Sequence, residues 1–180
     1  MPISQTIPKK KIVLKFARFF LSLSTAITVF YLTSYSAMVK SQSIESDQLI
    51  IKNGVYYSKN TGEPFTGEVS GKESGSLKDG RAEGFWEYYY DDGSIWWLGK
   101  YRRGIRIGHW QWFFENGQMS SQGYYEDGIW HGPWVWYHPN GEVRLRGNYE
   151  NGKAEGRWRY YYDTGRIKEI RNYKNGKRIT

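Results

Sequence analysis

The sequence predicts an all-β protein: one elongated antiparallel sheet of stacked β-hairpins, preceded by one N-terminal hydrophobic helix. The sheet is predicted by a set of Gly, Trp and Tyr residues that recurs every 24 residues in the second half of the chain. It is also predicted by composition, because 9 Trp, 16 Tyr and 21 Gly among 180 residues suit strands joined by tight turns. The helix is predicted by an uncharged stretch from Phe19 to Val39.

Residues 1–40 form a leader that is typical of a signal peptide or of a signal-anchor transmembrane segment. Basic residues precede the uncharged stretch, which is long enough to cross a bilayer as a helix. Small residues at Ser34 and Ser36 would permit cleavage before Ala37, so cleaved and anchored forms both stay open. The alternative, a buried core helix, is disfavoured because no polar stripe appears at helical spacing. We expect a secreted or membrane-anchored protein, contacting the membrane through residues 19–39, with its repeats on the extracytoplasmic side.

After the leader we expect three parts. Residues 41–55 are polar and mixed in character, and they are interpreted as a linker. Residues 56–83 are interpreted as a degenerate N-terminal cap repeat, because they keep only some repeat positions in phase. Residues 84–180 form four 24-residue repeats. The aromatic positions that recur in phase are Trp86, Trp110, Trp134 and Trp158, and then Tyr101, Tyr125, Tyr149 and Tyr173.

Each repeat is predicted to be a β-hairpin. Its first strand begins at the Trp and ends at a turn containing DDG, ENG, PNG or DTG. Asp-Gly and Asn-Gly favour type I′ turns, so we predict that turn type here. The second strand ends at the Tyr and is followed by RRG, EDG, ENG or KNG, which leads into the next repeat.

The segment YEDGIWHGPW at 125–134, running into YHPNG at 137–141, resembles the MORN repeat. More closely, it resembles bacterial MORN-repeat-variant proteins, whose units are written G-x-W-x-x-Y-x-x-N-G. This resemblance implies a MORN-like solenoid, which is an elongated sheet of stacked hairpins without catalytic residues. Some members of that family are labelled as antitoxins of toxin–antitoxin systems.

The net charge of +8 does not indicate nucleic-acid binding, because most of the excess lies in the leader. Residues 156–180 carry eight basic and two acidic side chains. This basic C-terminal repeat is predicted either to discourage edge-to-edge strand pairing or to attract an anionic partner such as acidic lipid head groups.

The sequence indicates no catalytic, metal or cofactor site. It contains no cysteine, and its three histidines occupy three different positions of the repeat. The Trp and Tyr positions are interpreted as structural, because a single-sheet solenoid needs ring-on-ring packing as its core. A second aromatic series on the opposite side of the strands is the candidate contact surface, and it comprises Tyr89, Phe113, Tyr137 and Tyr161.

We therefore expect a non-catalytic module that binds an unidentified protein through an extended sheet face. Two alternatives stay open. One is a cell-envelope binder of carbohydrate or choline-like groups, because Gly, Trp and Tyr-Tyr hairpin repeats of about 20 residues serve that purpose in surface proteins. The other is an antitoxin-like inhibitor of a toxin partner.

Overall fold

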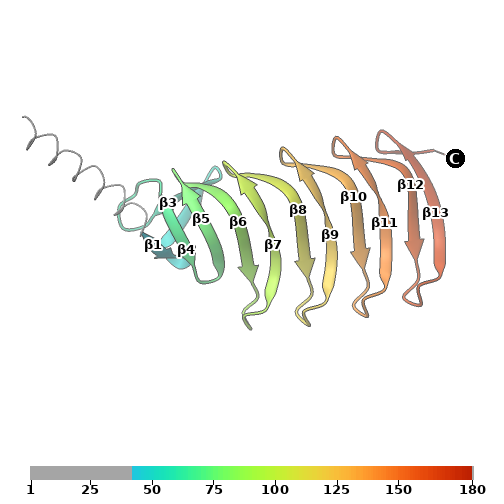
Figure 1. The fold of residues 1–180 in the computed structure, drawn as a ribbon, viewed down its shortest axis with the longest axis horizontal. Coiled ribbons are helices and arrows are strands. Elements are labelled where there is room, and N and C mark those ends of the chain that lie inside the picture. Colours follow the sequence, from blue (N-terminus) through green and yellow to red (C-terminus); the bar gives the residue numbers. More distant parts are fainter. Residues whose placement is uncertain (1–41, 180) are drawn as a thin grey trace, which may run out of the picture. The chain divides into compact units, whose positions relative to one another are not determined.

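The computed structural model describes residues 42–179, and within them nearly all regular structure is β (Figure 1). Twelve strands of these residues form one sheet in the order β1-β4-β5-β6-β7-β8-β9-β10-β11-β12-β13-β14, and β2 pairs with β3 separately. The strands are β1 Ser43–Glu45, β2 Leu49–Lys52, β3 Val55–Ser58, β4 Gly67–Ser70, β5 Glu73–Lys78, β6 Arg81–Tyr89, β7 Ile95–Arg102, β8 Ile105–Phe113, β9 Met119–Glu126, β10 Ile129–Tyr137, β11 Val143–Glu150, β12 Lys153–Tyr161, β13 Ile167–Lys174 and β14 Lys177–Ile179, and a short 3-10 helix covers Ser46–Gln48. The predicted all-β sheet of stacked hairpins is confirmed.

The hydrophobic helix expected within residues 1–40 lies outside the described residues, so it stays a prediction. Among residues 42–179, the structure contains no helix with the length and apolar character needed to cross a membrane.

Four hairpins with the same register make up most of the sheet: β6–β7, β8–β9, β10–β11 and β12–β13. In the first, Trp86 lies opposite Gly99, and in the second Trp110 lies opposite Gly123. Each hairpin also contains an irregularity near its loop, where the register shifts between Tyr88 and Tyr89 in the first hairpin. Such a bulge places two successive residues on the same side of the strand, which breaks simple alternation.

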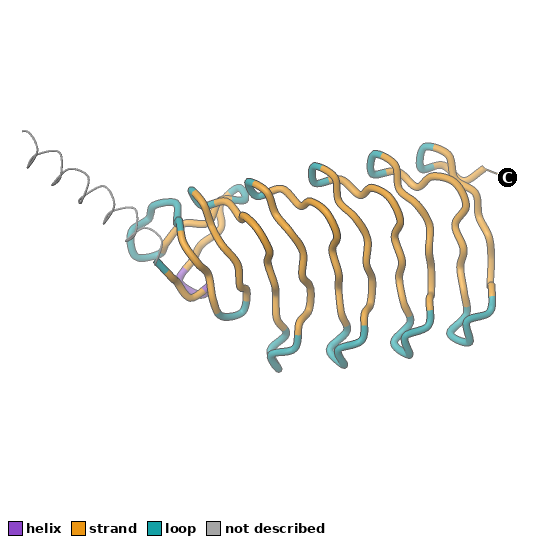
Figure 2. Tube along the Cα trace, viewed as in Figure 1, coloured by secondary structure: helices purple, strands orange, loops and turns teal. Residues whose placement is uncertain are grey.

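Two kinds of turn connect the strands, one kind at each end of the strands (Figure 2). Tight turns connect one hairpin to the next, and both of their central residues have positive φ, as in Asp127 (47°) and Gly128 (82°). This is the type I′ pattern, which matches the twist of the flanking strands.

The turns within the hairpins are wider, and here the type I′ prediction was wrong. In the first of them, the N–H of Tyr90 donates to the carbonyl of Ser94, and the N–H of Gly93 donates to the carbonyl of Tyr90. Only the glycine has positive φ, which is the pattern of a type I turn followed by a left-handed glycine. The Thr of DTG fits this geometry because its position needs no positive φ.

The core is a ladder of aromatic rings on one side of the sheet, which we call the Trp face. The four repeated Trp residues are almost fully buried, with exposed fractions of 1 % at Trp86, 0 % at Trp110, 2 % at Trp134 and 3 % at Trp158. Tyr residues from neighbouring strands contact these rings edge-on, as Tyr101 does with Trp110 at 5.0 Å between centroids and 90° between planes. Edge-to-face contacts of this kind add stability beyond the area they bury.

Backbone hydrogen bonds also join consecutive hairpins at the tight-turn edge. The N–H of Gly104 donates to the carbonyl of Ala82 at 2.8 Å, and the N–H of Gly128 donates to the carbonyl of Arg106 at 2.9 Å. Each turn is therefore attached to the strand one repeat earlier, in addition to the pairing within the sheet.

The N-terminal end of the Trp face is covered by residues that precede the repeats. Leu49 is buried in one cluster with Val69, Leu77, Ala82 and Trp86, and partly buried Ile44, Tyr56 and Phe65 pack against it. The segment 41–55, interpreted from the sequence as a linker, therefore contains β1, β2 and the start of β3. Its apolar side chains cover the first Trp, which would otherwise face solvent.

Candidate functional site

The four residues of the candidate contact surface lie on the side of the sheet away from the Trp face, which we call the opposite face. Tyr89, Phe113, Tyr137 and Tyr161 come at the ends of β6, β8, β10 and β12, and all four are half-buried. The sheet has no second layer over this face within residues 42–179. Among the described residues, these rings therefore lie half-buried on a face without a second layer.

Part of the hydrogen-bonding capacity of this column is already used within the chain. The hydroxyl of Tyr89 donates to the Glu87 carboxylate, and the amide of Gln122 donates to the hydroxyl of Tyr137 at 2.6 Å. The hydroxyl of Tyr161 is buried and makes no hydrogen bond within the described residues. The column thus offers ring surface rather than a row of free hydroxyl groups.

The same face becomes cationic toward the C-terminal end of the sheet. Arg146 on β11 lies directly opposite Arg159 on β12. Within residues 42–179, no carboxylate lies at ion-pair distance from either guanidinium group. Arg146 lies over the ring of Tyr161, with its Cζ atom 5.5 Å from the centroid. Like charges directly opposite each other destabilise a strand pair, so this arrangement favours an anionic partner.

The Trp face has its own side chains that sequence reasoning did not single out. The guanidinium group of Arg106 lies over Trp110, 4.7 Å from the ring centroid, and Trp130 lies 4.7 Å from Trp134. With neighbouring aromatic rings they line an open groove of about 520 Å³. Arg106 and Trp130 replace the Ala found at the same position in the first and last repeats, which is the signal that could have identified them.

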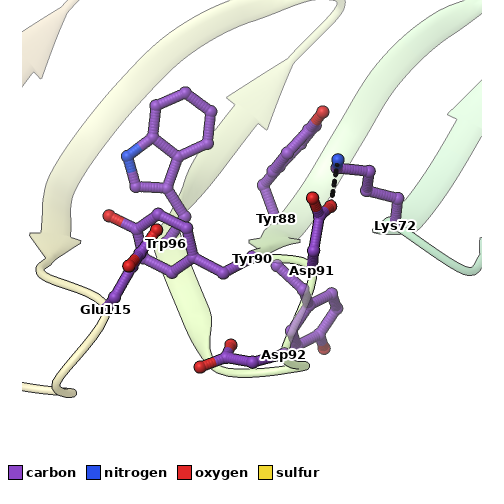
Figure 3. Close-up of a pocket in the computed structure, with 8 residues that line it drawn as sticks. Lys72, Tyr88, Tyr90, Asp91, Asp92, Trp96 and Glu115 are labelled. Atoms are coloured by element: carbon purple, nitrogen blue, oxygen red, sulfur yellow. Dashed lines mark hydrogen bonds and ion pairs between the residues drawn. The ribbon is translucent and has the colours of Figure 1, made fainter.

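A smaller pocket of about 380 Å³ lies at the wide turn of the first hairpin (Figure 3). Its aromatic lining comprises Tyr88, Tyr89, Tyr90 and Trp96. The Trp96 ring lies 5.3 Å from Tyr88 at 76° and 5.9 Å from Tyr90 at 35°. Asp92 from the same turn and Glu115 from the next one add carboxylates to its lining. We call this the first-turn pocket.

The two aspartates of the first-turn pocket interact with different groups. Asp91 forms an ion pair with Lys72 at 2.6 Å. Asp92 accepts hydrogen bonds from the backbone and side chain of Ser94, which lower the pKa of its carboxyl group. Burial, followed by the charges of Glu115 and Asp92, raises the pKa of the Tyr90 hydroxyl. Tyr90 therefore stays neutral, in a negative local field.

Sequence reasoning missed the first-turn pocket because alternation places Trp96 on the other side from Tyr88. The bulge near the wide turn puts Trp96 beside Tyr88 and Tyr90. A signal was present, because the residues aligned with Trp96 in the later repeats are Ser120, Arg144 and Lys168.

The three histidines lie apart and each has a local contact. His109 lies beside the Gln122 side chain at 3.1 Å, His131 contacts Glu126 at 3.3 Å, and His138 lies 3.2 Å from the Tyr161 carbonyl. The described part of the chain contains no group of three or more His, Cys, Asp or Glu side chains arranged to hold a metal ion.

The geometry defines a class: a β-hairpin repeat protein in which one buried Trp recurs in every repeat. The family model of the MORN repeat variant matches three consecutive segments, at residues 106–127, 130–151 and 154–175. The chain thus carries MORN-variant repeats, as the sequence resemblance predicted. The matched segments cover the β8–β9, β10–β11 and β12–β13 hairpins, and the β6–β7 hairpin with the first-turn aromatic rings precedes them.

No match was found among curated proteins. Among solved structures, one similar chain comes from the crystal structure of a GtfA/B complex bound to UDP and GlcNAc. It shares 12 % sequence identity, the alignment covers 69 % of this chain and 23 % of that chain, and the TM-score is 0.23. This chain therefore corresponds to less than a quarter of the length of that solved chain.

Proposed function

We propose that this protein is a non-catalytic repeat module, exported or tethered to a membrane through residues 19–39, that binds an acidic protein surface. The opposite face makes the contact, with its C-terminal arginines at the centre. MORN-variant repeats are consistent with a binding module.

The observation that carries this proposal is the Arg146–Arg159 pair. The two guanidinium groups belong to directly paired residues of β11 and β12. At the same paired position one repeat earlier, the chain has Gln122 and Val135, so the repeat itself does not require a charge. A carboxylate-bearing partner would relieve the repulsion and could accept bidentate hydrogen bonds from either arginine.

Apolar surface next to the arginines favours a protein over a small anion. Ile170, paired with Arg159, is 39 % exposed. Farther along the same face, on β9, Tyr124 is 44 % exposed. Interfaces between proteins combine exposed aromatic and aliphatic side chains with arginine, and lysine is less frequent there.

Site-specific photo-crosslinking in the native cell tests which face is used. A photoreactive phenylalanine analogue replaces Tyr124 on the opposite face or, as the control, Trp130 on the Trp face, where the exposed fractions are 44 % and 37 %. We expect a discrete protein adduct from position 124 and none of the same mass from position 130. An adduct formed only from position 130 would contradict the proposed face.

The captured protein is then titrated against the purified full chain. The double variant Arg146→Gln/Arg159→Gln should bind about tenfold or more weakly, as expected when desolvated charge contacts are removed. The control Arg81→Gln/Arg166→Gln removes the same charge at the two loop edges and should change the affinity less than about twofold. If both double variants lost the same affinity, the loss would follow from net charge alone. That result would contradict a localised binding site.

A further inference from the structure

We propose that the first-turn pocket binds an organic ammonium ion, with an alkylated ammonium group such as that of choline against Tyr88, Tyr90 and Trp96. The lining of the pocket includes neither Arg146 nor Arg159, although Tyr89 belongs both to this lining and to the opposite face. This inference therefore does not rest on the Arg146–Arg159 pair that carries the proposed protein-binding function.

The aromatic geometry suits a cation with an apolar surface. Trp96 stands nearly perpendicular to Tyr88, at 76°, and is tilted by 35° relative to Tyr90. Rings in different orientations present several electron-rich faces to one space, which attracts a cation more strongly than one flat surface. Trp96 is 42 % exposed, so part of its ring is free to contact a ligand.

The charged groups around the pocket select for a cation. Glu115, Asp91 and Asp92 contribute three carboxylates, and Lys72 is the cation that faces them. Lys72 pairs with Asp91 at 2.6 Å, which leaves Asp92 and Glu115 as the negative charges nearest Tyr90. An anion would be repelled here, and a neutral ligand would gain nothing from this field.

The fourth hairpin shows a cation in the equivalent place within the same chain. Tyr162 occupies the position of Tyr90, and Lys168 occupies the position of Trp96. The ammonium group of Lys168 lies over the Tyr162 ring, 5.5 Å from its centroid. In the first hairpin Trp96 stands in place of this lysine, so the space beside Tyr90 is open to a cation from outside the chain.

The experiment uses the purified full chain, kept in a detergent without a choline head group. Choline chloride is titrated at constant ionic strength while the nine Trp indole N–H signals are followed by two-dimensional NMR. The Trp96 signal is identified by its loss in Trp96→Ser, which copies the second repeat. We expect a saturable shift of this signal with choline and none with 3,3-dimethyl-1-butanol, its neutral isostere. Equal shifts with both compounds, or no saturable shift with choline, would overturn the proposal.

Two variants and a matched control locate the site. Trp96→Lys copies the fourth repeat, supplies an internal ammonium group and should weaken choline binding about tenfold or more. Glu115→Gln should weaken it about two- to fivefold, as expected for an exposed charge. Asp163 occupies the position of Glu115 in the wide turn of the fourth hairpin, far from the pocket in sequence. As the control, Asp163→Asn should leave the affinity unchanged. Trp96, Glu115 and Asp163 are all exposed, and the fourth repeat already has a lysine at the position of Trp96. We therefore expect all three variants to fold. Native affinity in a folded Trp96→Lys variant would overturn the proposal.

Discussion

The indole ring of Trp110 lies against the backbone of Gly99, so closely that a Cβ atom on Gly99 would come within 2.2 Å of ring atom Cδ2. Gly99 belongs to β7 and Trp110 to β8, so the contact joins one hairpin to the next. The same relationship recurs in Gly75 with Trp86, Gly123 with Trp134, and Gly147 with Trp158. The glycine is thus required for space, and the Trp is buried because the glycine lets it approach.

Gly99→Ala should destabilise the fold by about 3 kcal/mol, the upper end of ordinary overpacking costs, because a ring fixed by its neighbours cannot yield. In a Trp110→Ala background the same change should cost less than about 1 kcal/mol, since the clashing ring is gone. Urea unfolding of the two single variants and the double variant gives the coupling. Additive losses would contradict the contact.

Trp110→Ala and Trp134→Ala should each cost about 3–5 kcal/mol, the usual loss for a large buried aromatic side chain. Their side chains are 0 % and 2 % exposed. Gln111→Ala, which follows Trp110 but points to the opposite face, should stay within about 0.5 kcal/mol. Thermal unfolding compares the three, and equal melting temperatures for the Trp and Gln variants would contradict the face assignment.

Arg103→Asn should stabilise the protein by about 0.5–1 kcal/mol, because Arg103 has φ of 53° and asparagine tolerates this left-handed conformation better. The reverse exchange at the equivalent turn, Asn151→Arg, should lower stability by a similar amount, since Asn151 has φ of 50°. Chemical denaturation measures both, and changes of the same sign would argue against backbone conformation as the cause.

Glu73→Gln should remove part of the pH dependence of stability. Burial raises the pKa of Glu73, and a hydrogen bond from Tyr56 only partly opposes this. The folded state therefore holds this proton more tightly than the unfolded state, whose carboxyl titrates near 4.5. Stability is then lost as the pH rises from about 4.5 through the folded pKa. We expect the variant to lose less stability over this range than the native protein, as followed by melting temperature, and an unchanged profile would contradict it.

Deleting residues 1–40 should release a soluble protein that folds with the melting temperature of the full chain. Residues 42–180 form a compact unit of their own, and the cluster around Leu49 closes the first repeat within it. Circular dichroism and sedimentation of the truncated protein provide the measurement. A truncated chain that fails to fold while the full chain folds would make the leader part of the domain.

The sequence was most informative where one residue type had one physical reason to recur. The Trp and Gly positions recur because each ring needs a glycine beside it, so the hairpins and their spacing were predictable. The wide turns were assigned incorrectly because both kinds of turn end in glycine, and only loop length separates them. Thr164 already argued against a type I′ turn, because a β-branched residue disfavours the positive φ that such a turn requires at this position.

Features that depend on a single repeat were harder to predict. The first-turn pocket depends on a bulge that brings Trp96 to the side of Tyr88, and alternation along a strand cannot show this. The strands within residues 43–52 do not share the repeat pattern, so they looked like a linker. Their burial follows from the uncovered end of the Trp ladder, which becomes visible only once the hairpins are stacked.

The tight-turn hydrogen bonds, such as that from Gly104 to Ala82, attach each hairpin to its predecessor with the same geometry every 24 residues. Interaction energy is consequently shared between adjacent hairpins, as in other linear repeat proteins. A pulling force applied to the two ends of the sheet would meet a series of similar, separately breakable attachments. Each rupture would release one hairpin, or roughly 80 Å of extended chain at about 3.4 Å per residue. We expect such a sheet to absorb mechanical work in steps rather than to fail in a single event.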